Sequence, residues 1–218
     1  MQLSAEVRWF GLGSIPDDLR NWFLEPASAF GYPAGGGHRK RPDVYLRLKE
    51  PELSIKKRGG KEGFEVKGLV DTLPWQFQLG KITVPREPQL LCKWGSTELQ
   101  VANVPVVETE KLRWLRKFDT IGDPREIQLG AGEFGEDPLL PSERPDVGCN
   151  IELTLVTTGG TRWWTFGAES FAFKQPGQTT ALVSQGLQQV MRALSSRATI
   201  NLGDARYYGY GEWIAAME

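Results

Sequence analysis

The chain of 218 residues carries 26 Lys and Arg against 27 Asp and Glu, and its isoelectric point is near 6.0. A net charge of −1 gives no overall field that would attract nucleic acid or an anionic membrane, so any anion site must be local. Hydrophobic residues make up 40% of the sequence, as is typical of a soluble globular protein, and we expect residues 1–218 to form one domain.

The cysteines, the histidine and the lack of targeting signals exclude several kinds of site and of partner. Cys92 and Cys149 lie outside any CxxC motif or Cys/His cluster, which argues against a zinc site and a disulfide framework. His38 is the only histidine and follows three glycines, so we expect it in a loop.

The absence of an apolar leader and of a run of about 18 apolar residues predicts a cytoplasmic protein with no membrane partner. The short basic cluster around His38 has no aromatic neighbours, so a nucleic-acid partner is not expected.

Alternating polar and apolar residues predict strands in the first third of the chain, and the polar positions are charged. In residues 4–10, Glu6 and Arg8 lie on one face, and Val7 and Trp9 on the other. The same alternation recurs in residues 44–49, 53–58 and 63–68. The glycines between the last two of these segments predict an antiparallel hairpin.

Further strands are predicted along the rest of the chain. They are residues 75–84, 89–94, 97–107, 110–118, 149–158 and 161–171. The acidic, Pro- and Gly-rich residues 119–146 read as a long connection with one short strand at 126–129.

Two helices are predicted among these strands. Ser14 as N-cap, followed by Pro16 and two aspartates, predicts a short helix over residues 19–23. Apolar residues at helical spacing predict a second helix over residues 179–197. These elements predict an all-β or a β-dominated α+β fold class, in which the strands form either a sandwich or a barrel.

The role of the charged strand faces stays open at this level. The charges can face water on the outside of a half-buried sheet, paired across strands. Alternatively they line the inside of a closed barrel, where dehydrated charges need an anion, a metal or water. Alternation alone does not separate these two arrangements.

The order of motifs resembles the CYTH or triphosphate tunnel metalloenzyme superfamily over most of the chain. The motifs are, in order, Ser4-x-Glu6-x-Arg8, YLRL, LSIKKRGG, FEVKGL, KLRWLRKF, CNIELTLV and DARYYGYGEWIAAM. The resemblance implies an antiparallel, tunnel-like β-barrel with a few flanking helices. Where that superfamily has ExExK, this chain has Ser4 in place of the first acid and Arg8 in place of the lysine.

The resemblance also implies a site. The implied phosphate-binding residues are Arg8, Arg47, Lys56, Lys67, Arg113 and Lys117. For the last two the choice of strand face is open, because Trp114, Arg116 and Phe118 form an equally good pattern. Glu6, with Glu152 or Glu65, is the implied ligand set for Mg²⁺ or Mn²⁺. The acids of related enzymes are expected near Glu169, although GAESF does not reproduce their spacing.

Three functions follow from these alternatives. The first is a divergent metal-dependent phosphohydrolase that acts on a triphosphate-bearing compound or inorganic polyphosphate through a metal-activated water. The second is a barrel that binds a phosphorylated small molecule or polyphosphate without catalysis. The third is a β-rich interaction protein whose charges all face water.

Overall fold

The structure is a computed structural model that describes residues 2–24, 32, 34–36, 40–76, 78–79, 82–129, 144–173, 179–195 and 201–217. His38 and most of the acidic connection lie outside these described residues. None of the helices within the described ranges is long and apolar enough to cross a membrane.

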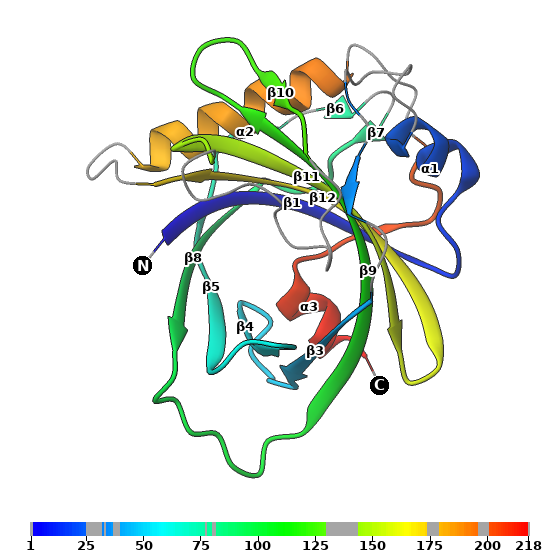
Figure 1. Cartoon of the computed structure of the whole chain (residues 1–218), viewed down its shortest axis with the longest axis vertical. Helices are drawn as coiled ribbons and strands as arrows, with labels where there is room; N and C mark the ends of the chain where they lie inside the picture. Colours follow the sequence, from blue (N-terminus) through cyan, green and yellow to red (C-terminus); the bar gives the residue numbers. More distant parts are fainter. Residues whose placement is uncertain are drawn as a thin grey trace.

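Eight antiparallel strands close into a barrel (Figure 1). In barrel order they are β9 (Val106–Asp119), β11 (Val147–Thr158), β12 (Thr161–Ala172), β1 (Gln2–Leu12), β8 (Gln89–Ser96), β5 (Phe64–Thr72), β4 (Leu53–Arg58) and β3 (Arg41–Leu46). The β3–β9 pairing closes the ring. This confirms the predicted fold class, a β-dominated antiparallel barrel.

Shorter elements flank the barrel. They are the strands β2 (Gly35–Gly36), β6 (Gln78–Leu79), β7 (Ile82–Thr83), β10 (Arg125–Ile127) and β13 (Arg206–Tyr207), and the helices α1 (Asp17–Leu24), α2 (Thr179–Ser195) and α3 (Tyr210–Ala215). The helices predicted at 19–23 and from 179 are confirmed, whereas residues 196–197 lie outside the described part. Helix α3 was not predicted.

The predicted hairpin is formed by β4 and β5, which pair antiparallel with Lys56 opposite Glu65. Gly60 and Gly63 in its turn have φ of 80° and 76°, a conformation that glycine adopts without the steric cost of a Cβ. The pairing places the inward side chains of the two strands beside each other.

Several strand predictions are wrong in extent. The strand predicted at 44–49 is β3, which begins at Arg41 and ends at Leu46. Residues 97–105 form no strand, because Asn103 has φ of 60° and Pro105 has no N–H to donate, and β9 therefore begins at Val106. The described residues of the range 75–84 contribute the two-residue strands β6 and β7. The short strand expected at 126–129 is β10, which begins one residue earlier and ends two residues earlier than predicted.

The main hydrophobic core lies outside the barrel, between the sheet and the helices. Val7 and Trp9 of β1 and Phe166 of β12 belong to one buried cluster with Val183 and Leu187 of α2. Figure 1 shows α2 across the outer face of these strands. Since the apolar phase of each strand faces outward here, the charged phase must face the lumen.

A second, smaller core fills one part of the lumen. It consists of Phe10, Tyr45, Val107, Val156, Trp213 and Ile214. The last two belong to α3, which lies within the ring of strands in Figure 1. The aromatic rings contact one another, with Phe10 and Trp213 stacked at a centroid distance of 4.6 Å. Helix α3 therefore acts as an apolar plug inside the barrel.

We expect the outer core to carry the stability of the barrel. Leu187→Ala should lower the free energy of unfolding by about 2–5 kcal/mol, because Leu187 is fully buried against the sheet. Gln185→Ala, on the exposed side of the same helix, should change it by less than about 0.5 kcal/mol. Urea unfolding measures both, and equal effects of the two substitutions would contradict the placement of the core.

Candidate functional site

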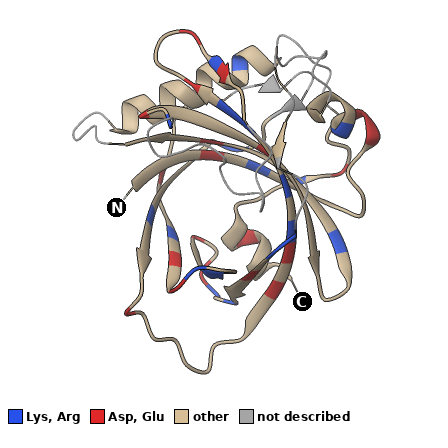
Figure 2. Ribbon diagram, in the orientation of Figure 1, with Lys and Arg blue, Asp and Glu red and all other residues tan. Residues whose placement is uncertain are grey.

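A strongly charged cavity of about 260 Å³ lies in the barrel lumen, and we call it the charged cavity. Its charged lining consists of nine cationic residues and four glutamates: Arg8, Arg41, Lys56, Arg58, Lys67, Lys93, Lys111, Arg113, Arg144, Glu6, Glu65, Glu152 and Glu169. Figure 2 shows Lys, Arg, Asp and Glu along the barrel strands around the lumen. The charged faces of the strands therefore do not simply face bulk water.

Strand alternation places these side chains. Glu6 and Arg8 of β1 point into the lumen because Val7 between them packs in the outer core. Lys56 of β4 and Lys67 of β5 also line the charged cavity, whereas Lys57, next to Lys56, is exposed. The close spacing of charges follows from strands that lie about 4.8 Å apart.

Arg8 is the centre of one ion-pair network. The side chain is 4% exposed, and its Nε lies 2.6 Å from Glu6 Oε1 while its Nη2 lies 3.1 Å from Glu152 Oε2. Arg113 Nη1 contacts the other oxygen of Glu152 at 2.8 Å. Each carboxylate is thus held by a guanidinium group at a depth where an unpaired charge would be costly.

Gly167 makes room for this arrangement. It stands opposite both Arg8 of β1 and Glu152 of β11 in the sheet register. A Cβ built on Gly167 would lie 2.9 Å from the central carbon of the Arg8 guanidinium. The absence of a side chain therefore allows Arg8 to lie flat against β12 and reach Glu152.

Lys67 extends the network to a third glutamate. Its Nζ contacts Glu6 and lies 2.8 Å from Glu169 Oε1. Lys67 therefore bridges β1 and β12 from its place on β5, across the lumen. Cations and carboxylates alternate along the whole network, which offsets the loss of hydration in the interior.

Asp43 of β3 is the centre of a second network. It has no exposed surface, and its carboxylate contacts Arg41 Nε at 3.0 Å, Lys56 Nζ at 3.3 Å and Lys111 Nζ at 3.5 Å. Lys56 also lies 3.4 Å from Glu65. Three basic side chains thus surround one fully buried carboxylate.

Lys111 is held by aromatic groups as well as by Asp43. Its Nζ donates to Tyr45 Oη at 2.5 Å and lies 3.8 Å from the centroid of the Tyr210 ring. Burial, with Lys56 nearby, holds the pKa of Lys111 well below its usual range. Tyr45 and Tyr210 therefore form the boundary between the charged cavity and the apolar plug.

The networks shift the pKa values of the buried acids. Burial acts to raise the pKa of Glu152, but Arg113 and Arg8 outweigh it and hold this pKa well below its usual range. In the same way Lys67 and Lys93 outweigh burial and lower the pKa of Glu169 to about 2. Both glutamates are therefore ionised at neutral pH.

The pKa of Lys56 shifts toward the neutral form of the side chain, whereas the pKa values of Glu152 and Glu169 shift toward the charged form. Burial lowers its pKa to about 8, even though Asp43 and Glu65 favour the charged form. Lys56 therefore titrates within reach of physiological pH.

Four of the six predicted phosphate-binding residues line the charged cavity, namely Arg8, Lys56, Lys67 and Arg113. Arg47 does not, because β3 ends at Leu46, and it lines a different cavity. Lys117 lies on the inward phase of β9 but beyond the cavity, with Nζ 4.8 Å from the ring centroid of Phe171.

The open question about the phase of β9 is thereby answered. Lys111 and Arg113 face the lumen. Arg116 faces outward, where it donates to the carbonyl oxygens of Phe23 and Tyr32 and pairs with Glu126 at 2.7 Å. This second set of contacts ties β9 to α1 and β10 rather than to a ligand.

Several residues of the site were not predicted. The lining residues among them are Arg41, Tyr45, Arg58, Lys93, Lys111, Arg144 and Tyr210. Asp43, which is fully buried behind the lining, was not predicted either. Asp43 and Tyr45 lie two residues apart and so share one face of β3. The alternation of this strand could therefore have identified Asp43 if the start of the strand had been predicted at Arg41. Arg144 lies in the acidic connection, where no pattern points to the lumen.

The three predicted metal ligands all line the charged cavity, but each is paired with two cations. Glu6 contacts Arg8 and Lys67, and Glu152 contacts Arg8 and Arg113. Glu65 lies 3.2 Å from Arg58 and 3.4 Å from Lys56. Within the described ranges, no group of three or more Asp, Glu, His or Cys side chains is placed to hold a metal ion.

Mg²⁺ and Mn²⁺ require several oxygen ligands that face one ion. The carboxylates in this arrangement face guanidinium and ammonium groups, so they do not fit such a site. The expected metal binding stays a prediction.

A scan of the sequence against protein-family models gives no match, and a search of curated proteins gives none either. The resemblance to the triphosphate tunnel superfamily therefore stays a prediction from the order of the motifs.

We expect the Arg8 network to be needed for stability. Arg8→Ala should lower the free energy of unfolding by about 3 kcal/mol, because it leaves two buried carboxylates short of a partner. Lys40→Ala removes the exposed pair with Glu110 and should cost less than about 1 kcal/mol. Chemical denaturation compares the two, and a cost for Arg8→Ala no larger than that for Lys40→Ala would show that the network is hydrated.

Proposed function

We propose that the charged cavity binds a compact polyanion, either polyphosphate or a phosphorylated small molecule. The observation that carries this proposal is the excess of nine basic residues over five acidic ones around one small volume, the five being the four lining glutamates and the buried Asp43. Positive charges confined in a partly dehydrated space repel one another, and an anion with several charged oxygens relieves that repulsion.

The chemistry of the lining supports phosphate groups in particular. Arg8 and Arg113 offer planar forks that match two phosphate oxygens, whereas Lys56 and Lys67 act as point charges. Lys93 also lines the cavity, and it has no ion-pair partner among the described residues. A ligand can therefore contact Lys93 without displacing a carboxylate.

Binding is the function that the arrangement supports best. Metal-dependent hydrolysis, which the resemblance implies, needs carboxylates that are available to a divalent cation, and Glu6, Glu65 and Glu152 are engaged with cations. An interaction protein with all its charges in water is disfavoured because the glutamates and most of the cations of the cavity are buried or half-buried.

The test compares two neighbouring lysines on opposite faces of β4. Lys56→Ala should weaken the binding of tripolyphosphate at low salt by about tenfold, as expected for one close charge in a shielded site. Lys57→Ala removes the same charge from the exposed face and should leave the affinity unchanged. Isothermal titration calorimetry gives both affinities.

The Lys57→Ala variant provides the control for nonspecific attraction. Equal losses for Lys56→Ala and Lys57→Ala, or no binding of tripolyphosphate to the wild type at low salt, would refute the proposed function. Double substitution of Lys56 and Lys67 by Ala should remove most of the remaining affinity.

The pKa of Lys56 predicts a pH dependence. A bound polyanion favours the protonated lysine, so binding takes up a proton and the affinity should fall as the pH rises through about 8. Lys56→Arg keeps its charge throughout and should show a smaller fall between pH 7 and 9.5. The difference between the two titrations isolates Lys56 from protonation of the ligand, and identical pH profiles would show that Lys56 does not titrate in the site.

A further inference from the structure

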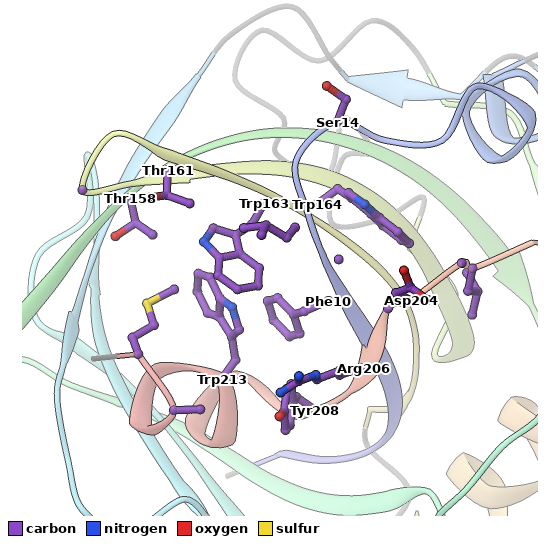
Figure 3. A pocket seen from close by; sticks show the side chains of 18 of the residues that line it. Phe10, Ser14, Thr158, Thr161, Trp163, Trp164, Asp204, Arg206, Tyr208 and Trp213 are labelled. Carbon is purple, nitrogen blue, oxygen red and sulfur yellow. The ribbon is translucent and has the colours of Figure 1, made fainter.

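A second and larger cavity, of about 910 Å³, lies further along β1, and we call it the aromatic cavity (Figure 3). Its wall begins at Phe10, two residues beyond Arg8, and continues through the β11–β12 turn to α3. The two cavities share no lining residue. Contacts of Tyr210 with Phe10 and Trp213, at centroid distances of 5.1 Å and 5.9 Å, form the partition between them.

Aromatic side chains dominate the middle of this cavity. Figure 3 shows Phe10, Trp163 and Trp213 close together, with Tyr208 near them. Phe10 and Trp213 are stacked, and Trp163 meets the edge of Trp213 at 5.8 Å. Trp163 and Tyr208 are half-buried, so their rings are available to a flat ligand, and the volume lies within the range of small-molecule sites.

Two buried donors in this wall have no acceptor among the described residues. Trp213 is 2% exposed, and its indole N–H is unpaired. The Nε of half-buried Arg47 is unpaired as well, and no carboxylate of the described part pairs with this guanidinium. Neither atom has accessible surface, so neither contacts a molecule in the cavity directly. What the cavity gains from Arg47 is the rest of a guanidinium group that no carboxylate of the described part neutralises.

The charges of the wall select the acceptor. Arg47 and Arg206 contribute positive charge and Asp204 one negative charge, which leaves a small positive excess. Arg206 and Asp204 are exposed, so half-buried Arg47 is the more shielded of the two cations. One planar guanidinium fork fits one carboxylate, whereas a phosphate dianion is better matched by the many cations of the charged cavity.

From these observations we infer that the aromatic cavity binds a planar aromatic carboxylate, with its ring against Trp163 and its acid group at Arg47. This site is distinct from the polyanion site and does not rest on the proposed function. It also gives a role to Arg47, which lines the aromatic cavity rather than the charged cavity because β3 ends at Leu46.

Calorimetry with indole-3-carboxylate on the full chain tests the proposal. Arg47→Gln should weaken its binding by about tenfold and leave the weaker binding of neutral indole unchanged. Lys49→Gln, an exposed lysine two residues away, should have no effect on either probe.

Competition separates this cavity from the charged one. Saturating tripolyphosphate should leave the affinity for indole-3-carboxylate unchanged, because no lining residue is shared. Competition between the two, equal affinities of wild type and Arg47→Gln, or no binding at the solubility limit of indole-3-carboxylate would overturn the proposal. Tighter binding of adenosine monophosphate than of indole-3-carboxylate would overturn the carboxylate assignment in favour of a nucleotide.

Discussion

The cost of dehydrating charge is the constraint on which the rest of this structure depends. A barrel whose charged strand faces point inward places arginines, lysines and glutamates where isolated ions would be unstable. Alternation of charge along the network answers this constraint, since Glu169, Lys67, Glu6, Arg8 and Glu152 follow one another in contact. The basic residues of the lining still outnumber the acidic ones, and this excess is the basis of the anion site that we propose.

The inward direction of the charged strand faces also explains where the hydrophobic residues lie. With the apolar phases of β1, β11 and β12 facing outward, a cover is needed on the outside, and α2 supplies it through Val183 and Leu187. Inside, the charged wall gives way beyond Arg8 to the aromatic plug around Trp213. The lumen is thereby divided into one cavity suited to multiply charged anions and another suited to flat rings.

Much of the barrel could be predicted from the sequence because strand alternation is a local signal. The β4–β5 hairpin and the outward packing of Val7 both follow from residues close in the chain. The inward direction of the charges was not contained in the alternation and came from the resemblance in motif order. That resemblance also identified Arg8, Lys56, Lys67 and Arg113 as residues of one wall.

What could not be predicted depends on where elements end and on contacts between distant strands. Arg47 continues the spacing of Asp43 and Tyr45, which face inward, but it follows the last residue of β3 and therefore lines the aromatic cavity. The counterion Asp43 gains its role only when β9 closes the barrel against β3 and brings Lys111 to it. Helix α3 has only six residues, with Gly209 before it and Gly211 inside it, so a short isolated helix is not expected here and burial in the lumen is needed to stabilise it.

The most direct test of the inward-facing charge is a crystal structure of the protein grown with tripolyphosphate. The account predicts the phosphate groups inside the barrel, in contact with Arg8, Lys56 and Lys67. Lysine side chains at 56 and 67 directed into bulk solvent, with Ile55 and Val66 in the lumen, would contradict it.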